Sequence, residues 1–114
     1  MTTKKIMQAL YANSIAGIED NYRELYSHED WKNNNDNYSV AITQFYTNLN
    51  EDQKEKFFTI MKQIVTDSFA IAFSILDGST TSELENEFYI VDTENNKHEF
   101  LLDYFLDVAA DNGK

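Results

Sequence analysis

Four carboxylates recur at every fourth position near the C-terminus of the chain: Glu99, Asp103, Asp107 and Asp111. On a helix, a step of four residues advances the side chain by about 40°, so the last three share an arc of about 80°. Like charges at this spacing repel, and carboxylates are unfavourable in the last turn, where the helix dipole is negative. Such a conflict with stability indicates another role, and carboxylates in this pattern would bind a metal ion or a basic partner.

Two aromatic residues, Phe100 and Tyr104, fall on the same outer arc as the aspartates, and tyrosine is enriched at the energetic centres of protein interfaces. Alternate residues of an extended segment point the same way, so a nearby acidic segment could enlarge this surface. We predict a partner-binding surface that comprises Glu99, Asp103, Tyr104, Asp107 and Asp111, extended by Glu83, Glu85 and Glu87. The alternative is a solvated helix face whose internal repulsion is tolerated.

The negative charge is unevenly distributed along the chain. Residues 1–66 contain nine acidic and seven basic residues, whereas residues 67–114 contain eleven and two, so the second region carries −9 of the net −11. Solubility alone does not require this concentration, which favours a basic protein partner. The same charge argues against direct binding to nucleic-acid phosphates and against an anionic membrane surface.

The chain contains little that indicates catalysis or metal binding. Its two histidines, His28 and His98, are not at metal-ligand spacing. Asp92, Glu94, Asn96 and Asp103 follow the spacing of ligands in a calcium-binding loop. Lys97, however, occupies the position at which such a loop requires glycine. The three scattered glycines form no phosphate-binding loop, and no nucleophile motif is present. We predict a non-enzymatic protein without a metal or a cofactor.

The composition and length of the chain indicate its cellular compartment and its number of domains. No cysteine is present, which fits a reducing compartment. The apolar residues near the N-terminus are interrupted by Gln8 and Asn13 and form no signal segment, and no run approaches the about 18 apolar residues of a membrane span. We expect a soluble, cytoplasmic protein that folds as one domain, 1–114.

Hydrophobic periodicity predicts two helices in the first half of the chain. Apolar residues recur at spacings of three and four over about 3–27, which is typical of one apolar helix face. A stretch rich in turn-forming residues follows at 27–37 and is predicted to be a loop that holds Trp31. A shorter periodic segment predicts the second helix at about 38–48.

A long central helix is predicted at about 51–77. Asn50 and Gln53 can form a capping box at its start, and Gly78 can supply a left-handed cap at its end. Residues 68–76 are apolar or small on every side, so this half is expected to be surrounded by other elements.

The remaining segments complete the expected fold. A polar loop at 79–86 precedes a short β hairpin or strand at about 87–98, with a turn at Asn95 and Asn96, and a C-terminal helix at about 98–110. We expect a mainly α fold, with α+β as the alternative, in which three N-terminal helices pack around the long central helix.

In its size, its acidity, its lack of cysteine and its stripe of Glu99, Asp103, Asp107 and Asp111 with Tyr104, the chain resembles the small acidic immunity proteins that neutralise bacterial nuclease toxins, including those of colicin and contact-dependent inhibition systems. The adjacent tyrosines and the proline of the colicin-nuclease group are absent. The resemblance implies an immunity- or antitoxin-type inhibitor whose acidic surface covers the basic active site of a toxin. The alternatives are a phage-type nucleic-acid mimic that inhibits a defence nuclease, and an oligomeric adaptor in which residues 69–76 pair with a second copy as a homodimer.

Overall fold

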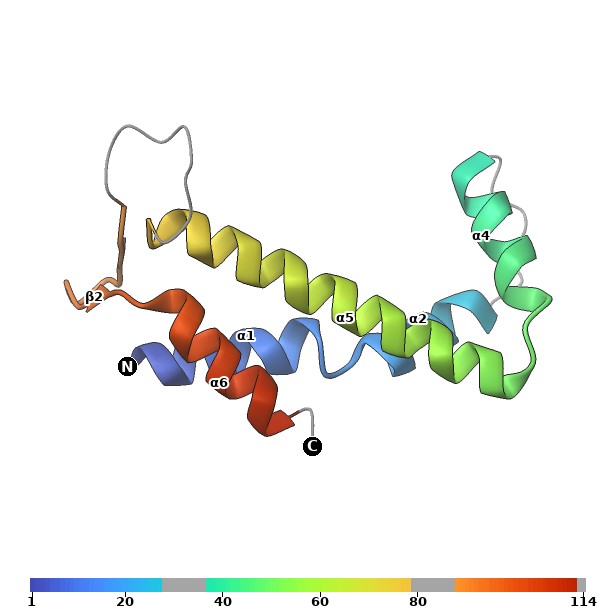
Figure 1. Ribbon diagram of the computed structural model, residues 1–114, viewed down its shortest axis with the longest axis horizontal. Coiled ribbons are helices and arrows are strands. Elements are labelled where there is room, and N and C mark those ends of the chain that lie inside the picture. Colours follow the sequence, from blue (N-terminus) through green and yellow to red (C-terminus); the bar gives the residue numbers. More distant parts are fainter. Residues whose placement is uncertain (28–36, 79–87, 113–114) are drawn as a thin grey trace. The chain divides into compact units, whose positions relative to one another are not determined.

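The computed structural model describes residues 1–27, 37–78 and 88–112. Three predicted features therefore lie outside the described residues: the loop that holds Trp31, the loop at 79–86, and the acidic residues Glu83, Glu85 and Glu87. The described chain is mainly helical with one small antiparallel sheet, which confirms the mainly α fold class (Figure 1). It divides into two compact units, a first unit formed by Met1–Ala16 and Ile64–Lys114 and a second unit formed by Gly17–Gln63.

The elements follow one another along the chain as α1 (Thr3–Ser14), α2 (Ile18–Ser27), α4 (Asn37–Thr47), α5 (Glu51–Leu76), β1 (Ile90–Val91), β2 (Lys97–His98) and α6 (Leu101–Asn112). Helix α5 contributes its N-terminal half to the second unit and its C-terminal half to the first.

The prediction of one helix over 3–27 is wrong, because α1 ends at Ser14 and α2 begins only at Ile18. At the break, the Ser14 hydroxyl donates a hydrogen bond to the main-chain oxygen one turn back, and two successive amides converge on the carbonyl of Tyr11. Side chains that bond the backbone compete with the helical ladder, and Gly17 lowers the helix propensity further. The apolar periodicity continues across the break, which is why it suggested one helix.

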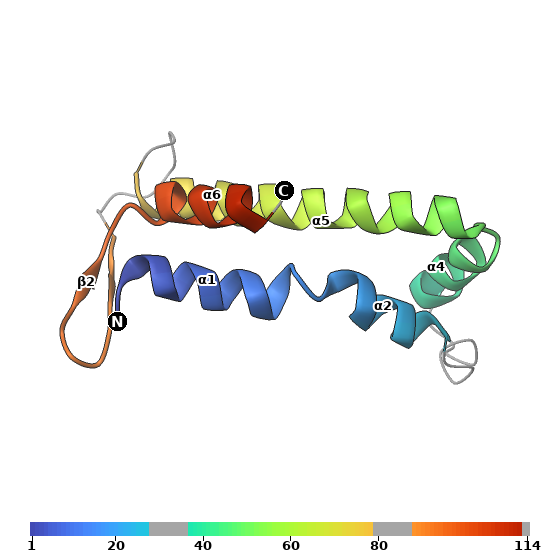
Figure 2. The same ribbon diagram turned by 90° about the horizontal axis from the view of Figure 1, so that it is seen from below.

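The core of the first unit contains an aromatic cluster between α5 and α6. Helix α1 packs against α6 (Figure 2). The ring of Phe105 is fully buried, and its centroid lies 5.9 Å from that of Phe69 and 5.3 Å from that of Phe73. The buried apolar residues of this unit are Met7, Ile15, Phe73, Leu101, Phe105 and Val108. Because α6 supplies three of them, its rotation about its own axis is fixed by the core.

The prediction that residues 68–76 are surrounded is wrong. Within this stretch only Phe73 and Ser74 are buried, whereas Ile71 is 61% exposed. The residues that contact α6 lie on one side of α5, and apolar composition alone does not reveal how many neighbours a helix has. The first unit therefore leaves part of an apolar helix face open.

Among the described helices, α5 is the one whose length and apolar composition would allow it to cross a membrane. That criterion is weak by itself, because core helices of soluble proteins meet it as well. Lys62 and Asp67 lie in the middle of α5, where charged side chains are expensive in a bilayer. The absence of a membrane span stays a prediction.

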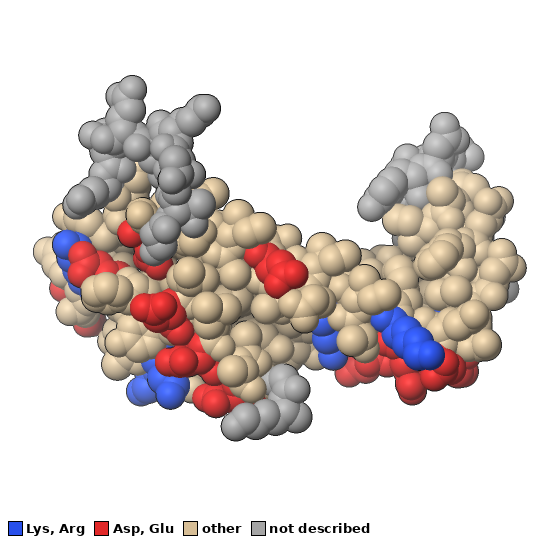
Figure 3. Space-filling view, viewed as in Figure 1, with Lys and Arg blue, Asp and Glu red and all other residues tan. Residues whose placement is uncertain are grey.

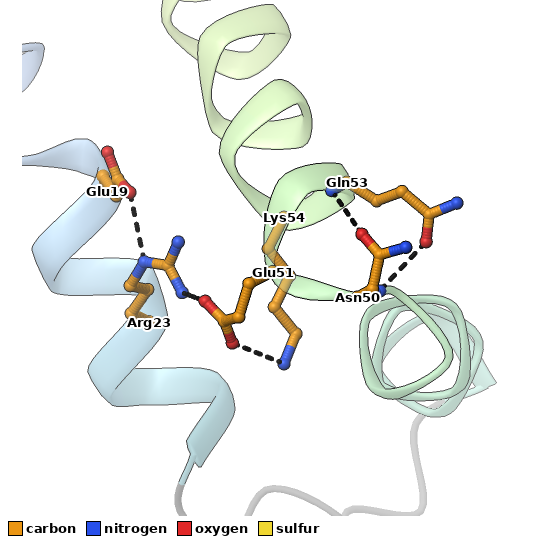
Figure 4. Close-up of polar contacts among 6 residues, drawn as sticks. All are labelled: Glu19, Arg23, Asn50, Glu51, Gln53 and Lys54. Atoms are coloured by element: carbon orange, nitrogen blue, oxygen red, sulfur yellow. Dashed lines mark hydrogen bonds and ion pairs between the residues drawn. The ribbon is translucent and has the colours of Figure 1, made fainter.

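The predicted capping box at the start of α5 is confirmed. The main-chain amide of Asn50 donates to Gln53 Oε1, the amide of Gln53 donates to Asn50 Oδ1, and both distances are 2.9 Å (Figure 4). In the next position, the Glu51 carboxylate accepts a hydrogen bond from Arg23 Nη1 of α2 at 3.1 Å and pairs with Lys54. These contacts fix where α5 begins and join it to α2 within the second unit.

Replacing Asn50 with alanine removes one of the two reciprocal bonds and leaves the Gln53 amide without its acceptor. We expect Asn50→Ala to lower the free energy of unfolding by about 1 kcal/mol. Urea denaturation followed by circular dichroism measures this. Asn48→Ala, two residues earlier and outside the box, is the control and should be nearly neutral; equal losses in both variants would contradict the assignment.

The C-terminal elements follow the prediction with one shift. Strands β1 and β2 pair antiparallel, Asn95 has a left-handed φ of 66° in the turn, and Gly78 has a φ of 73° after α5, all as expected. Helix α6 begins at Leu101 rather than at 98, because His98 belongs to β2. The segment between them therefore joins a strand directly to a helix.

Candidate protein interface on the C-terminal helix

Helix α6 begins at a carboxylate that comes from the end of α5. Asp77 accepts hydrogen bonds from the main-chain amides of Leu101 at 3.1 Å and of Leu102 at 2.8 Å. These amides have no partner within the helix, and a carboxylate suits the positive end of the helix dipole. Sequence reasoning missed this role because the contact joins positions 24 and 25 residues apart, and an aspartate beside the predicted Gly78 cap was its only local sign.

The outward face of α6 carries the predicted aspartates. Leu101, Phe105 and Val108, which recur at helical spacing, are buried and form the inward face of α6. Asp103, Asp107 and Asp111 are exposed, and none of them forms an ion pair with a described residue. Figure 3 shows the resulting stripe of acidic side chains along α6. The structure therefore brings these three residues together on one solvent-facing side.

Glu99 differs from the other three carboxylates. It precedes α6 instead of lying on it, and it pairs with Lys97 Nζ at 2.7 Å. The same ammonium group lies 4.2 Å from the centre of the Tyr89 ring. The charge of Glu99 is thus partly compensated, and the predicted helical stripe of four consists of three aspartates on α6 with Glu99 beside its start.

Phe100 joins β2 to α6 in a conformation that few residue types adopt. Its φ is 57°, in the left-handed region that a bulky residue avoids, and its side chain is 64% exposed. Asp77 fixes the two residues that follow, and the Lys97–Glu99 pair precedes it. An exposed aromatic ring held in an unfavourable backbone conformation is typical of a residue kept for a contact rather than for stability.

Replacing Phe100 with glycine is expected to raise the free energy of unfolding by about 0.5–1 kcal/mol. Glycine relieves a left-handed strain of about 1–2 kcal/mol at the cost of a more flexible unfolded chain, and the exposed ring contributes little burial. Phe100→Ala keeps a Cβ atom and should give no such gain. Denaturant titrations of both variants measure the difference, and a Phe100→Gly protein less stable than Phe100→Ala would refute the strain.

Two further apolar side chains flank the aspartates of α6. Tyr104 is 38% exposed, as its place on the outer arc predicted, and Leu106 is 45% exposed on the other side of Asp107. Sequence reasoning missed Leu106, because a leucine next to an apolar helix face is normally assigned to the core. The predicted contributions of Glu83, Glu85 and Glu87 lie outside the described residues.

His98 lies inside the first unit. It is 3% exposed, its Nε2 lies 3.0 Å from Asp92 Oδ2, and its Nδ1 lies 2.9 Å from the hydroxyl of Thr3 at the start of α1. Both ring nitrogens are therefore occupied, and residues 95 positions apart are joined. We assign this Thr3–His98–Asp92 chain to holding the hairpin on α1, a contact that no local pattern could indicate.

The hydrogen bond from His98, together with those from the main-chain amides of Asn96 and Glu94, holds the pKa of Asp92 well below its usual range. A carboxyl whose pKa is lowered by folding stabilises the protein at neutral pH, and the contribution is lost as the pH falls below about 4. Asp92→Asn should therefore lower the melting temperature at pH 7, and its difference from the wild type should shrink below pH 4. Thermal melts from pH 7 to pH 2 test this, and a constant difference would contradict it.

The described residues offer no metal site, since no group of three or more His, Cys, Asp or Glu side chains among them could hold an ion. The calcium-loop reading fails at its first position, because the Asp92 carboxylate is already bonded to His98 and to two main-chain amides. What the site offers instead is an acidic face on a helix of fixed orientation, bordered by exposed apolar side chains. Comparison with family models, with characterised proteins and with solved structures gave no match.

Proposed function

We propose that this protein is a non-enzymatic inhibitor of immunity or antitoxin type. Its acidic face on α6, defined by Asp103, Asp107 and Asp111, covers a basic substrate-binding surface on a partner such as a nuclease toxin. The observation that carries the proposal is that these three carboxylates are exposed on one side of a helix and have no pairing partner among the described residues.

Rigidity supports a binding role for this face. Asp77 caps the start of α6, and the burial of Phe105 and Val108 fixes its rotation, so the helix that carries the carboxylates is oriented before a partner arrives. A preorganised face loses little conformational freedom on binding. The repulsion among the aspartates, which weakens the isolated helix, is relieved when Lys or Arg side chains of a partner approach.

Charge and apolar contacts contribute at different ranges. The net charge of −9 over residues 67–114 attracts a cationic protein from a distance, so association is fast at low salt and slows as salt screens it. At contact, the exposed side chains of Phe100 and Tyr104 supply the apolar anchors that such interfaces need. Together these features would block the entry of nucleic acid to the partner's active site.

Affinity capture from the source cell tests this proposal. The baits are the wild-type chain, the acidic-face variant D103N/D107N/D111N, and the control variant D20N/E24Q/E55Q, which changes the net charge equally through exposed acids of the second unit. We expect a basic protein on the wild-type and control baits that is lost from the acidic-face variant. Capture that is equal on all three baits would remove this role from the face, and a prophage-encoded or defence nuclease as the captured protein would favour the nucleic-acid mimic.

A homodimer is the second candidate, and exposed apolar residues on α5 favour it. Ile64 and Ile71 are 60% and 61% exposed on the part of α5 that belongs to the first unit. Apolar side chains at this spacing lie on one face of a helix, where a second copy could cover them. Sedimentation equilibrium over a wide concentration range tests this candidate, and a monomer at every concentration excludes it.

A further inference from the structure

The short hairpin has an outer edge that the described residues leave open. In the antiparallel pair, Ile90 lies opposite His98 and Val91 opposite Lys97, and the amide of Asp92 donates to the Asn96 carbonyl. Hydrogen-bonded and non-bonded pairs alternate along an antiparallel ladder, so the pair of Val91 and Lys97 is non-bonded. The N–H and C=O groups of Val91 therefore point away from β2, toward the outer edge of β1.

The side chains along this edge are apolar and exposed. Phe88, Tyr89, Ile90 and Val91 are consecutive, and each is between 45% and 55% exposed. Edge strands of soluble proteins are usually kept from pairing with another chain by their shortness, by a charged residue or by a proline. β1 is short, with two residues, but it carries no charge and no proline. An open edge with β-branched and aromatic side chains is the surface to which an added strand binds.

The charges around the hairpin select the occupant. Asp92 and Glu94 lie at the turn, and Lys97, the basic residue of the hairpin, is paired with Glu99. A second copy would bring the same acidic groups to the edge and would be repelled. A segment with Lys or Arg beside its apolar residues is complementary instead.

We propose that β1 binds an extended segment of the basic partner by strand addition, with the main chain of Val91 as the central hydrogen-bonding position. This inference rests on the proposed function and adds the mode of recognition to it. The acidic face of α6 then binds basic side chains, while the β1 edge binds main chain and alternate apolar side chains. The buried His98 holds the hairpin on α1 and so keeps the edge in place.

The test uses the full-length ¹⁵N-labelled chain and a synthetic peptide of alternating Val and Thr flanked by Lys. We expect the amide signals of Tyr89 and Val91 to shift on titration. Val91→Pro removes the outward N–H without removing a hydrogen bond of the hairpin and should weaken peptide binding by at least about tenfold, whereas Val91→Thr, which keeps the N–H, should stay within about threefold. Wild-type affinity in Val91→Pro, or no shift at Val91, would overturn strand addition.

Two further measurements keep the outcome unambiguous. If Val91→Pro disrupts the hairpin, as loss of the wild-type His98 signals would show, Val91→Lys replaces it and should weaken binding of the Lys-flanked peptide to the same extent.

A Glu-flanked peptide should bind at least about tenfold more weakly than the Lys-flanked one. Equal binding of the two peptides would show that the edge does not select a basic segment. A wild-type protein that is a dimer, and that Val91→Lys turns into a monomer, would show that a second copy occupies the edge instead. Peptide binding that disappears in D103N/D107N/D111N but persists in Val91→Pro would refute strand addition and leave the proposed function standing.

Discussion

Phe105→Ala is expected to lower the free energy of unfolding of the first unit by about 4 kcal/mol, the largest loss of stability foreseen for a single substitution. The ring is fully buried and lies in contact with Phe69 and Phe73 of α5. Its removal leaves a cavity between α5 and α6 that the surrounding side chains can fill only in part. Calorimetric or urea unfolding of the purified chain gives the value.

Tyr104→Ala, at the neighbouring position, provides the matched control for the loss of an aromatic ring. Tyr104 is 38% exposed and lies outside the cluster, so its truncation should lower stability by less than about 1 kcal/mol. Near-equal losses at the two positions would mean that α6 is not docked through Phe105. The orientation of the acidic face would then have no basis.

The acidic-face variant D103N/D107N/D111N is expected to weaken binding without a loss of stability. Affinity for the basic partner should fall about 100-fold, equivalent to about 3 kcal/mol, because three charges that would pair in the complex are removed. Stability should stay nearly constant, because relief of the repulsion among the three carboxylates and of the unfavourable place of Asp111 in the last turn offsets the loss of Asp103, whose place in the first turn suits the helix dipole. A variant that loses both stability and affinity would indicate a structural role for these residues.

Local sequence patterns predicted those parts of the fold that local physics determines. The Asn50–Gln53 capping box, the Gly78 cap and the turn at Asn95 each depend on residues within a few positions of one another, and each was found. The buried face of α6 follows from its 3.6-residue period in the same way.

The features that local patterns did not reveal depend on contacts between distant parts of the chain. Asp77 caps a helix 24 residues away, and His98 bonds Thr3 across 95 residues. Phe100 adopts its left-handed conformation because both neighbours are held, although the residue type itself disfavours it. The open face around Ile71 likewise depends on which elements pack on α5, which periodicity does not specify.

Some features of the candidate site follow from local sequence patterns, and others depend on contacts between distant residues. The stripe of Asp103, Asp107 and Asp111 was predictable, because helical spacing alone places them on one side. The separate position of Glu99, the exposure of Leu106 and the open edge of β1 required knowledge of where α6 begins and how the hairpin is paired.

The most direct test of the account is the dissociation constant of the captured basic partner, measured by calorimetry at about 50 mM and about 300 mM salt. The comparison includes the wild-type chain, D103N/D107N/D111N and the equally charged control D20N/E24Q/E55Q. We predict strong salt dependence for the wild type and the control, and an affinity about 100-fold weaker with a reduced salt dependence for the acidic-face variant. Equal affinities and equal salt dependence for the two variants would contradict a binding role for the acidic face of α6.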